Sequence, residues 1–210
     1  TYDTRDAFLS GQVLDAQARL NAANLVVDGK VSATAVASFT RLFTLLGLQP
    51  EMATELAAQM QKAQASSAGE SAPLMPRRME DLVWLGLPQA VVPLLAPYVT
   101  LLPTTTPVNL NTASAEVIYA AVPELDLAAA QRLVGTRNQA YFKDTATALA
   151  SVAPPGLTPD AGWTAASSSF FGVRGRLRLD QVALEEVSAV RRDPASRQVT
   201  TLWRERTAIG

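Results

Sequence analysis

The chain of 210 residues contains no cysteine and no histidine. Without cysteine it can form neither disulfides nor thiolate metal sites, and it has no thiolate nucleophile. Without histidine it lacks the commonest transition-metal ligand and the side chain best suited to proton transfer near neutral pH. Because most hydrolase designs depend on one of these residues, we predict that the protein is not an enzyme.

Aromatic side chains, excess charge and long apolar runs are also scarce. Aromatic residues make up 6% of the chain, which argues against a broad surface for stacking bases. Eighteen basic and 19 acidic residues leave a net charge of -1, so the overall balance favours neither nucleic acid nor an anionic membrane. No stretch reaches about 18 consecutive apolar residues. The hydrophobic share of 48% is that of a globular protein able to bury a core.

The start of the chain indicates one extended segment. Residues 7–18 set apolar positions among polar ones, which predicts a strand or a bent hairpin arm. Asp28 and Gly29 predict a turn, after which Ser32 or Thr34 can cap a helix.

Short helices are predicted across the middle of the chain, each from apolar residues at helical spacing. Gly47 and Gly86 are natural stops, and Pro93 either breaks one helix or delays its start. The predicted helices cover residues 34–46, 50–65, 79–85, 89–96, 113–121 and 127–137, with a last short one after residue 145. Proline-rich connectors at residues 103–107 and 154–159 interrupt this helical block.

From residue 167 the apolar period changes from helical to two, which predicts strands with one buried and one solvated face. Further strands follow at residues 182–191 and 199–205. Because a lone N-terminal strand is unstable, we expect it to pair with this C-terminal meander. The predicted fold is therefore α+β. Residues 1–28 and 163–210 form a β part, and residues 29–162 form an inserted α-helical domain with halves at 29–105 and 106–162.

The most informative motif runs from residue 108 to residue 114. Asn111 or Thr112 can accept hydrogen bonds from free amides at the start of the next helix, and Asn109 can fasten the incoming loop to its own backbone. The following pair of helices resembles a helix-hairpin-helix, a module that holds nucleic-acid phosphates by backbone amides. The hairpin at residues 123–126 has no glycine and carries two carboxylates, which oppose a phosphate. Nucleic-acid binding is therefore the alternative reading.

The other charged side chains can be explained by structural roles. Arg174, Arg176 and Arg178 form a basic stripe that is either a surface for an acidic partner or a solvated strand face paired with Glu185, Glu186 and Glu205. The acidic residues scattered along the chain are expected to be caps and turn formers: Asp15, Asp28, Asp81, Asp126, Asp144 and Asp160.

The chain resembles the K-type minor pseudopilin of the type II secretion system, often called general secretion pathway protein K. The resemblance rests on the segment that ends in Asn21 and leads to Asn24, and above all on the string with Asn109, Asn111 and Thr112. Further segments that carry it are residues 39–47 and 95–103, and Glu116 with Val117.

The resemblance implies a pilin-like antiparallel sheet with a large all-α domain, SAM-like or helix-hairpin-helix-like, inserted between its first strand and its meander. It also implies a transmembrane helix before residue 1, which would anchor the precursor in the inner membrane of a Gram-negative bacterium and leave this domain in the periplasm. The implied function is to cap the pseudopilus tip with the I-type and J-type minor pseudopilins and to promote its assembly for protein secretion, by protein–protein contact without catalysis.

A cofactor is not expected. Family members often carry an aspartate-rich stretch after the second inserted helix that could hold calcium. Here residues 56–64 offer no cluster of carboxylates, whereas calcium requires several oxygen ligands. We therefore predict no metal site, although the resemblance alone would suggest calcium.

Overall fold

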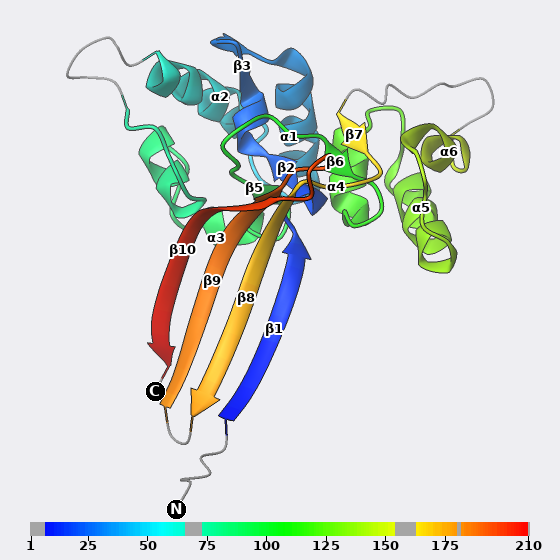
Figure 1. Ribbon diagram of the computed structural model, residues 1–210. Helices are drawn as coiled ribbons and strands as arrows, with labels where there is room; N and C mark the ends of the chain where they lie inside the picture. The colour runs from blue at the N-terminus through cyan, green and yellow to red at the C-terminus, as the bar shows by residue number, and fades with distance from the viewer. Residues whose placement is uncertain (1–6, 66–72, 154–162, 180–181, 210) are drawn as a thin grey trace, which may run out of the picture. The chain divides into compact units, whose positions relative to one another are not determined.

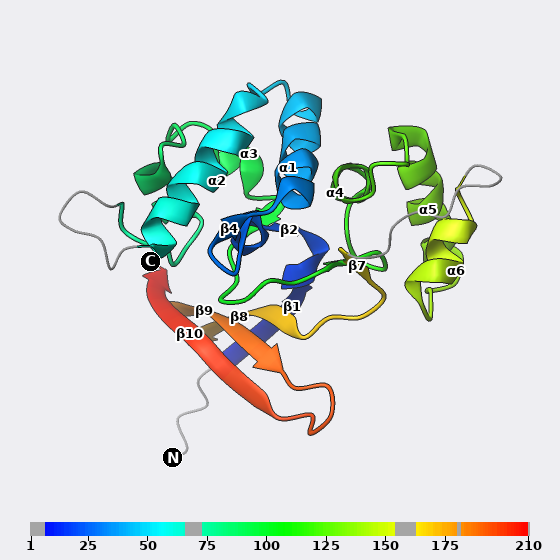
Figure 2. The same cartoon turned by 90° about the horizontal axis from the view of Figure 1, so that it is seen from above.

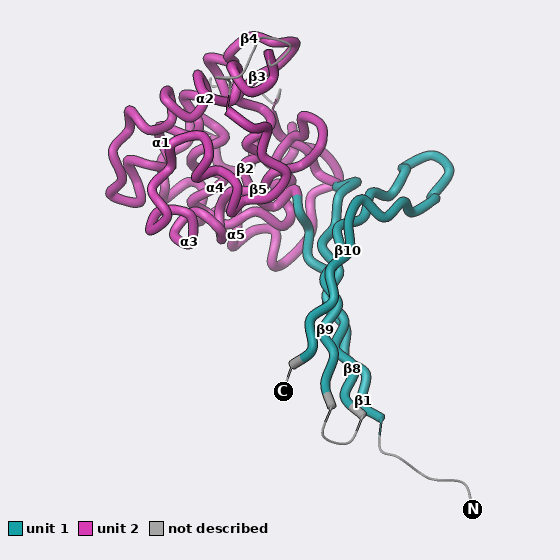
Figure 3. Tube along the Cα trace, turned by 90° about the vertical axis from the view of Figure 1, so that its left-hand side faces the viewer, with its two compact units in different colours: residues 1–16, 168–210 teal, residues 17–167 magenta. Residues whose placement is uncertain are grey.

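The computed structural model describes residues 7–65, 73–153, 163–179 and 182–209. The chain divides into two compact units (Figure 3). Unit 1 comprises residues 1–16 and 168–210, and unit 2 comprises residues 17–167. Unit 1 is a sheet, and all the α-helices of the described residues belong to unit 2. The structure is thus a mixed fold with an antiparallel sheet, as predicted.

Unit 1 contains four long strands in the order β1-β8-β9-β10, and every neighbouring pair is antiparallel (Figure 1). The strands are β1 (Ala7–Asp15), β8 (Phe170–Leu179), β9 (Val182–Arg192) and β10 (Val199–Ile209). The N-terminal strand therefore pairs with the C-terminal meander, as its instability alone led us to expect. Asp193 shapes the turn into β10 by accepting bonds from the backbone N–H groups of Ala195 and Ser196.

The strand register separates two faces of this sheet. One face, which we call the aliphatic face, carries Leu9, Val13, Val173, Leu177 and Leu184; the other, the arginine face, carries Phe8, Ser10, Gln12, Arg174, Arg176, Arg178 and Glu185. The prediction of one buried face is wrong for the described residues, because Leu9 is 81% exposed and Val13 65% exposed. The physical reason is that the strands form a single layer, and the buried apolar cluster contains no residue of this sheet.

Unit 2 contains α1 (Ala33–Leu45), α2 (Glu51–Gln64), α3 (Val92–Leu95), α4 (Ala115–Ala121), α5 (Leu127–Gln139) and α6 (Thr145–Ala150). Three 3-10 segments accompany them: η1 (Ala16–Ala18), η2 (Ala22–Leu25) and η3 (Glu80–Leu85). Short strand pairs join its loops: β2 (Leu20–Asn21) with β5 (Val99–Thr100), β3 (Val26–Val27) with β4 (Lys30–Val31), and β6 (Val108–Asn109) with β7 (Thr164–Ala165). Helix α1 lies beside both α2 and α4 (Figure 2).

Local chemistry explains most of these boundaries. Ser32, rather than Thr34, caps α1 by accepting a bond from the N–H of Ala35. Asp28 and Gly29 both have positive φ and close the β3–β4 hairpin, as predicted. Pro93 lies in the first turn of α3, so it delays this helix instead of breaking it. The helix predicted at residues 79–85 is a 3-10 segment. The predicted loop at 66–72 and connector at 154–159 lie outside the described residues.

The core of unit 2 forms around α1, whose Phe39, Leu42 and Phe43 are at most 1% exposed and pack with apolar residues of α2 and α4. Residues 17–28 and 163–167 belong to this unit, although we had assigned them to the β part. Leu20 and Leu25 are buried in the same core, and β7 pairs with β6. No helix within the described ranges is both long and apolar enough to cross a membrane.

Candidate functional site

Asn21 and Asn24 fasten the loop that enters the second half of unit 2. Asn21 is 1% exposed, and its Nδ2 donates to the carbonyl of Thr104 at 2.7 Å and to Oγ1 of Thr106 at 3.0 Å. Its Oδ1 accepts from the N–H groups of Ala23 and Leu102, each at 3.1 Å. Asn24 binds both the N–H and the carbonyl of Thr106. Two side chains from η2 and its cap thus satisfy the main chain of a loop about 80 residues away, which has no secondary structure of its own to do so.

Asn111 makes a second long-range anchor. Its Nδ2 donates to the carbonyls of Phe142 and Ala166 at 2.8 and 2.9 Å, and its Oδ1 accepts from the N–H of Phe142 at 2.8 Å. It therefore does not cap the next helix, and neither does Thr112. The cap of α4 is Ser114, whose Oγ accepts from the N–H of Val117. The capping prediction for Asn111 and Thr112 is wrong because their loop reaches the helix only after a further turn.

Asn109 and Thr112 act locally in the same loop. Oδ1 of Asn109 accepts from the N–H of Asn111 at 3.0 Å, which is the fastening of the loop to its own backbone that we predicted. Oγ1 of Thr112 donates to the carbonyl of Asn109. The five polar residues singled out in the sequence are thus structural, and they form two groups: Asn21 with Asn24, and Asn109, Asn111 and Thr112.

Two contacts of half-buried arginines were not predicted. Nη2 of Arg41 in α1 donates to the carbonyls of Tyr119 and Leu125 at 2.9 and 2.8 Å, and its guanidinium lies 4.0 Å from the ring centre of Tyr119. Arg137 in α5 donates to the carbonyls of Leu110 and Ala113. Burial lowers the pKa of Arg137. In the sequence, the carbonyls lie 24 to 84 residues from these arginines. No rule based on local spacing could therefore have predicted these contacts.

The α4–α5 hairpin is poorly suited to hold a phosphate. Oδ1 of Asp126 already accepts from the N–H of Ala129 at 2.6 Å, so a carboxylate occupies the amides at the start of α5. Arg41 and Arg137 turn their guanidiniums to carbonyls of the protein itself. The nucleic-acid reading is therefore not favoured.

The acidic side chains expected to form caps and turns mostly do so. Asp126 and Asp144 cap α5 and α6, and Asp81 accepts from the N–H groups that precede η3. The hydrogen bond from Thr147 lowers the pKa of Asp144. Asp15 instead accepts a bond from Oγ of Ser168 at 2.7 Å, and Asp160 lies outside the described residues.

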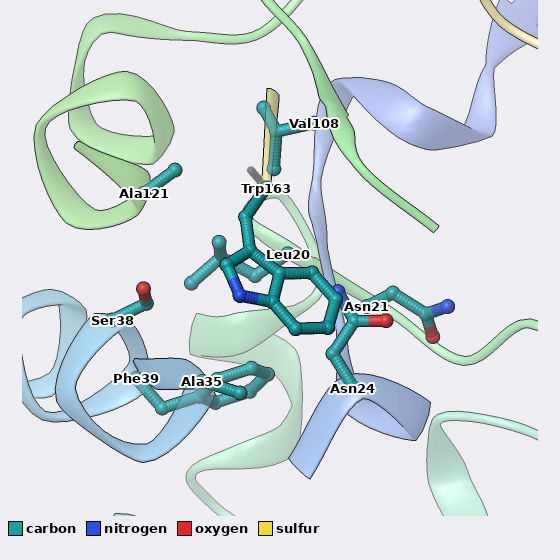
Figure 4. A pocket seen from close by; sticks show the side chains of 9 residues that line it. All are labelled: Leu20, Asn21, Asn24, Ala35, Ser38, Phe39, Val108, Ala121 and Trp163. Carbon is teal, nitrogen blue, oxygen red and sulfur yellow. The ribbon is translucent and has the colours of Figure 1, made fainter. Parts of the chain in front are cut away.

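A small hollow in unit 2 adjoins the first asparagine group (Figure 4). The indole of Trp163 forms part of its wall. The volume of the hollow is about 10 Å³, which is close to the minimum that can hold one water molecule. It is too small for an organic ligand. Its lining consists of Leu20, Asn21, Asn24, Ala35, Ser38, Phe39, Val108, Ala121 and Trp163.

The described residues contain no group of three or more acidic, histidine or cysteine side chains that could hold a metal ion. The predicted absence of a calcium site stays a prediction.

The sheet of unit 1 offers a more accessible surface. Nε of Arg174 lies 3.9 Å from a carboxylate oxygen of Glu185. This ion pair fits the interpretation of the arginines as a solvated strand face paired with glutamates. Glu186 does not take part, because the register places it on the opposite face, where it binds Arg204 and Arg206 at 3.1 and 2.6 Å. The bond from Arg206 lowers the pKa of Glu186.

Comparisons with known proteins agree on one family. Residues 18–104 and residues 108–169 each match a domain described as "Type II secretion system (T2SS), protein K". No curated protein matches the chain. A chain of the GspK-GspI-GspJ complex from the type 2 secretion system of enterotoxigenic Escherichia coli has the same fold, with a TM-score of 0.67 and 17% sequence identity. That match covers 98% of the present chain and 84% of the other. The two domain matches adjoin and together cover most of the chain, which belongs to the protein K family of the type II secretion system.

Proposed function

We propose that this protein is a non-catalytic minor pseudopilin that caps the tip of the type II secretion pseudopilus and promotes its assembly. The observation that carries the proposal is the pair of adjoining family matches, which run through both halves of the helical unit. The shared fold with a chain of a GspK-GspI-GspJ complex supports it.

A role without catalysis is supported by the chemistry of the described side chains. The chain has no histidine or cysteine. The carboxylates of Asp81, Asp126 and Asp144 accept hydrogen bonds from backbone N–H groups, so each already has a structural role. The side-chain amides of Asn21 and Asn111 donate hydrogen bonds to main-chain carbonyls of distant loops, so they too already have structural roles. Because these side chains hold the main chain of unit 2 in place, the unit is suited to a role that depends on contact with other proteins.

The family also supports a location. We propose that the domain resides in the periplasm of a Gram-negative bacterium, and that a transmembrane helix preceding residue 1 anchors the precursor in the inner membrane. Sequencing of the gene upstream of Thr1 tests this directly. An apolar segment of about 20 residues is expected there.

The proposed partners are the I-type and J-type minor pseudopilins of the same secretion system. The purified periplasmic domains of all three proteins are expected to elute as one complex in size-exclusion chromatography with light scattering. Pairwise mixtures serve as controls and identify which contact forms first. Deletion of this subunit is expected to reduce secretion, and the intact gene is expected to restore it. If the three domains stay apart and secretion persists in the deletion strain, the proposal is wrong.

The same preparation tests the alternative function. Fluorescence polarisation with labelled DNA is expected to show no salt-sensitive binding. Binding that Arg132→Glu in α5 weakens would instead support a nucleic-acid module, since Arg132 is exposed on the helix that follows the hairpin.

A further inference from the structure

The two edges of the sheet in unit 1 differ in how they are protected. At one edge, β10 has an irregular register between Thr201 and Trp203 and carries Arg204, Glu205 and Arg206. Bulges and charges of this kind prevent other strands from pairing with an edge. At the other edge, β1 pairs with β8 through nine consecutive residues without a bulge, and it has no charged residue or proline from Ala7 to Leu14 (Figure 1). Within the described part of the sheet, the β1 edge is therefore the more open of the two to another strand.

The backbone of β1 has hydrogen-bonding groups to spare. In an antiparallel pair, the N–H and C=O groups of every second residue point away from the partner strand. Among the described residues, those of Ala7–Leu14 have no backbone bond outside the pairing with β8. The side chains on both sides of the strand are also accessible, since Phe8 is 55% and Leu9 81% exposed. An added strand could therefore bond to the backbone and cover apolar surface at once.

Cations lie next to this edge on the arginine face. The guanidinium of Arg178 lies 4.5 Å from the ring centre of Phe8, so it extends over β1 itself. In the register, Arg176 lies between Ser10 of β1 and Glu185 of β9. Glu185 forms its ion pair with Arg174, so Arg176 has no ion pair within 4.0 Å among the described residues. Two cations are thus available to a neighbour of β1.

We propose that the free edge of β1 accepts an extended segment of a partner protein by β-strand addition, and that Arg176 and Arg178 select carboxylates at alternate positions of that segment. Strands lie about 4.8 Å apart, so the added strand would lie about 10 Å from β8. An arginine and a glutamate that lean toward each other span this distance across the short Ser10. The intervening side chains of the segment would be apolar and would cover Leu9 and Val13 on the aliphatic face.

Charge favours such a partner over a second copy of this chain. If two β1 strands paired, the arginine rows of the two copies would lie about 15 Å apart on one face. They would repel weakly, because this distance exceeds the Debye length of about 8 Å at physiological salt, and they would stay unpaired. An acidic segment brings opposite charge within reach of the same arginines. Neither this surface nor its recognition chemistry depends on the proposed partners.

The probe is a fluorescein-labelled peptide of four valine–glutamate repeats, titrated with the intact chain in fluorescence polarisation. We expect saturable binding that weakens as salt increases, and no binding of a peptide with lysine in place of glutamate. Arg176→Glu is expected to weaken binding by about tenfold, because it replaces an attraction with a repulsion. The matched control is Arg192→Glu, which makes the same charge change at an exposed position of the opposite face and is expected to leave binding within about twofold.

Hydrogen exchange locates the peptide. Its binding is expected to slow amide exchange within Ala7–Asp15 and to leave Val199–Ile209 unchanged. The proposal is overturned if the peptide does not bind, if both variants weaken it equally, or if protection appears at β10. Dimerisation of the chain alone that competes with the peptide would also overturn it, in favour of a second copy. Because no other pseudopilin is present, failure here is distinct from failure of the three-protein complex.

Discussion

Asn21→Ala should destabilise unit 2 more than any other single change at an asparagine in the described residues. The side chain is 1% exposed and makes four hydrogen bonds, two as donor and two as acceptor. A hydrogen bond contributes about 1 kcal/mol net, and a buried polar group left without a partner costs about 1–3 kcal/mol. Alanine would leave the N–H of Leu102 and the carbonyl of Thr104 without this partner. We therefore expect a loss of about 3–5 kcal/mol, a large share of the 5–15 kcal/mol typical of a domain.

Urea unfolding followed by circular dichroism at 222 nm measures this loss, because the α-helices of the described residues all belong to unit 2. Asn24→Ala removes two bonds to Thr106 and should cost less, about 2–3 kcal/mol. The double variant should lose less free energy of unfolding than the two single variants lose together, since both asparagines hold the same loop. Asn138→Ala, at an exposed position of α5, is the control and should change stability by less than about 0.5 kcal/mol. A loss at Asn21 no larger than at Asn138 would refute the anchoring role.

Three further perturbations test other contacts. Arg41→Lys should cost about 2 kcal/mol in the same unfolding assay, because a lysine lacks the planar fork that reaches two carbonyls, while Arg132→Ala on the surface should be nearly neutral. The pKa of Asp144 is lower in the folded protein than its ordinary value of 3.8, so its stabilising effect is present above that pH and is lost as the pH falls through the folded value. Asp144→Asn should therefore flatten the dependence of the unfolding midpoint on pH below about 4; an unchanged slope would contradict this. Gly86→Ala should lower the free energy of unfolding by about 1 kcal/mol, because Gly86 has φ of 92° and alanine is strained there. Gly135→Ala inside α5 should raise it by about 0.5–1 kcal/mol. Stability changes of the same sign at both glycines would contradict this reasoning.

Much of the fold was predictable because its signals act over a few residues. The change of apolar period after residue 167 predicted the meander, and the pairing of β1 with that meander followed from the need of a lone strand for a partner. The turn at Asp28 and Gly29 was predicted from residue type and position alone, and the cap of α1 was predicted to be Ser32 or Thr34, of which the structure has Ser32. Such features depend on the backbone conformation that a residue prefers, and this preference is visible in any sequence.

The role of the conspicuous asparagines was only partly predictable. Their identity marked them as structural, and Asn109 does bind its own loop. The cap of α4, however, is Ser114, and Asn111 instead bonds to Phe142 and Ala166. A side-chain amide can satisfy either a neighbouring helix end or a distant loop, and the choice depends on which main-chain groups folding brings near it.

What the sequence alone determined is therefore the main helices and long strands, several of their turns, and the family to which they point. Tertiary structure decided which long-range groups those elements bind. It set Arg41 against carbonyls 78 and 84 residues away and placed residues 17–28 in the helical unit. Its strand register also decided that Glu185, and not Glu186, shares a face with the arginines, and it left the β1 edge open beside Arg176 and Arg178. Local preferences are properties of short segments, whereas partners at long range exist only after the chain has closed its loops and set its strand register.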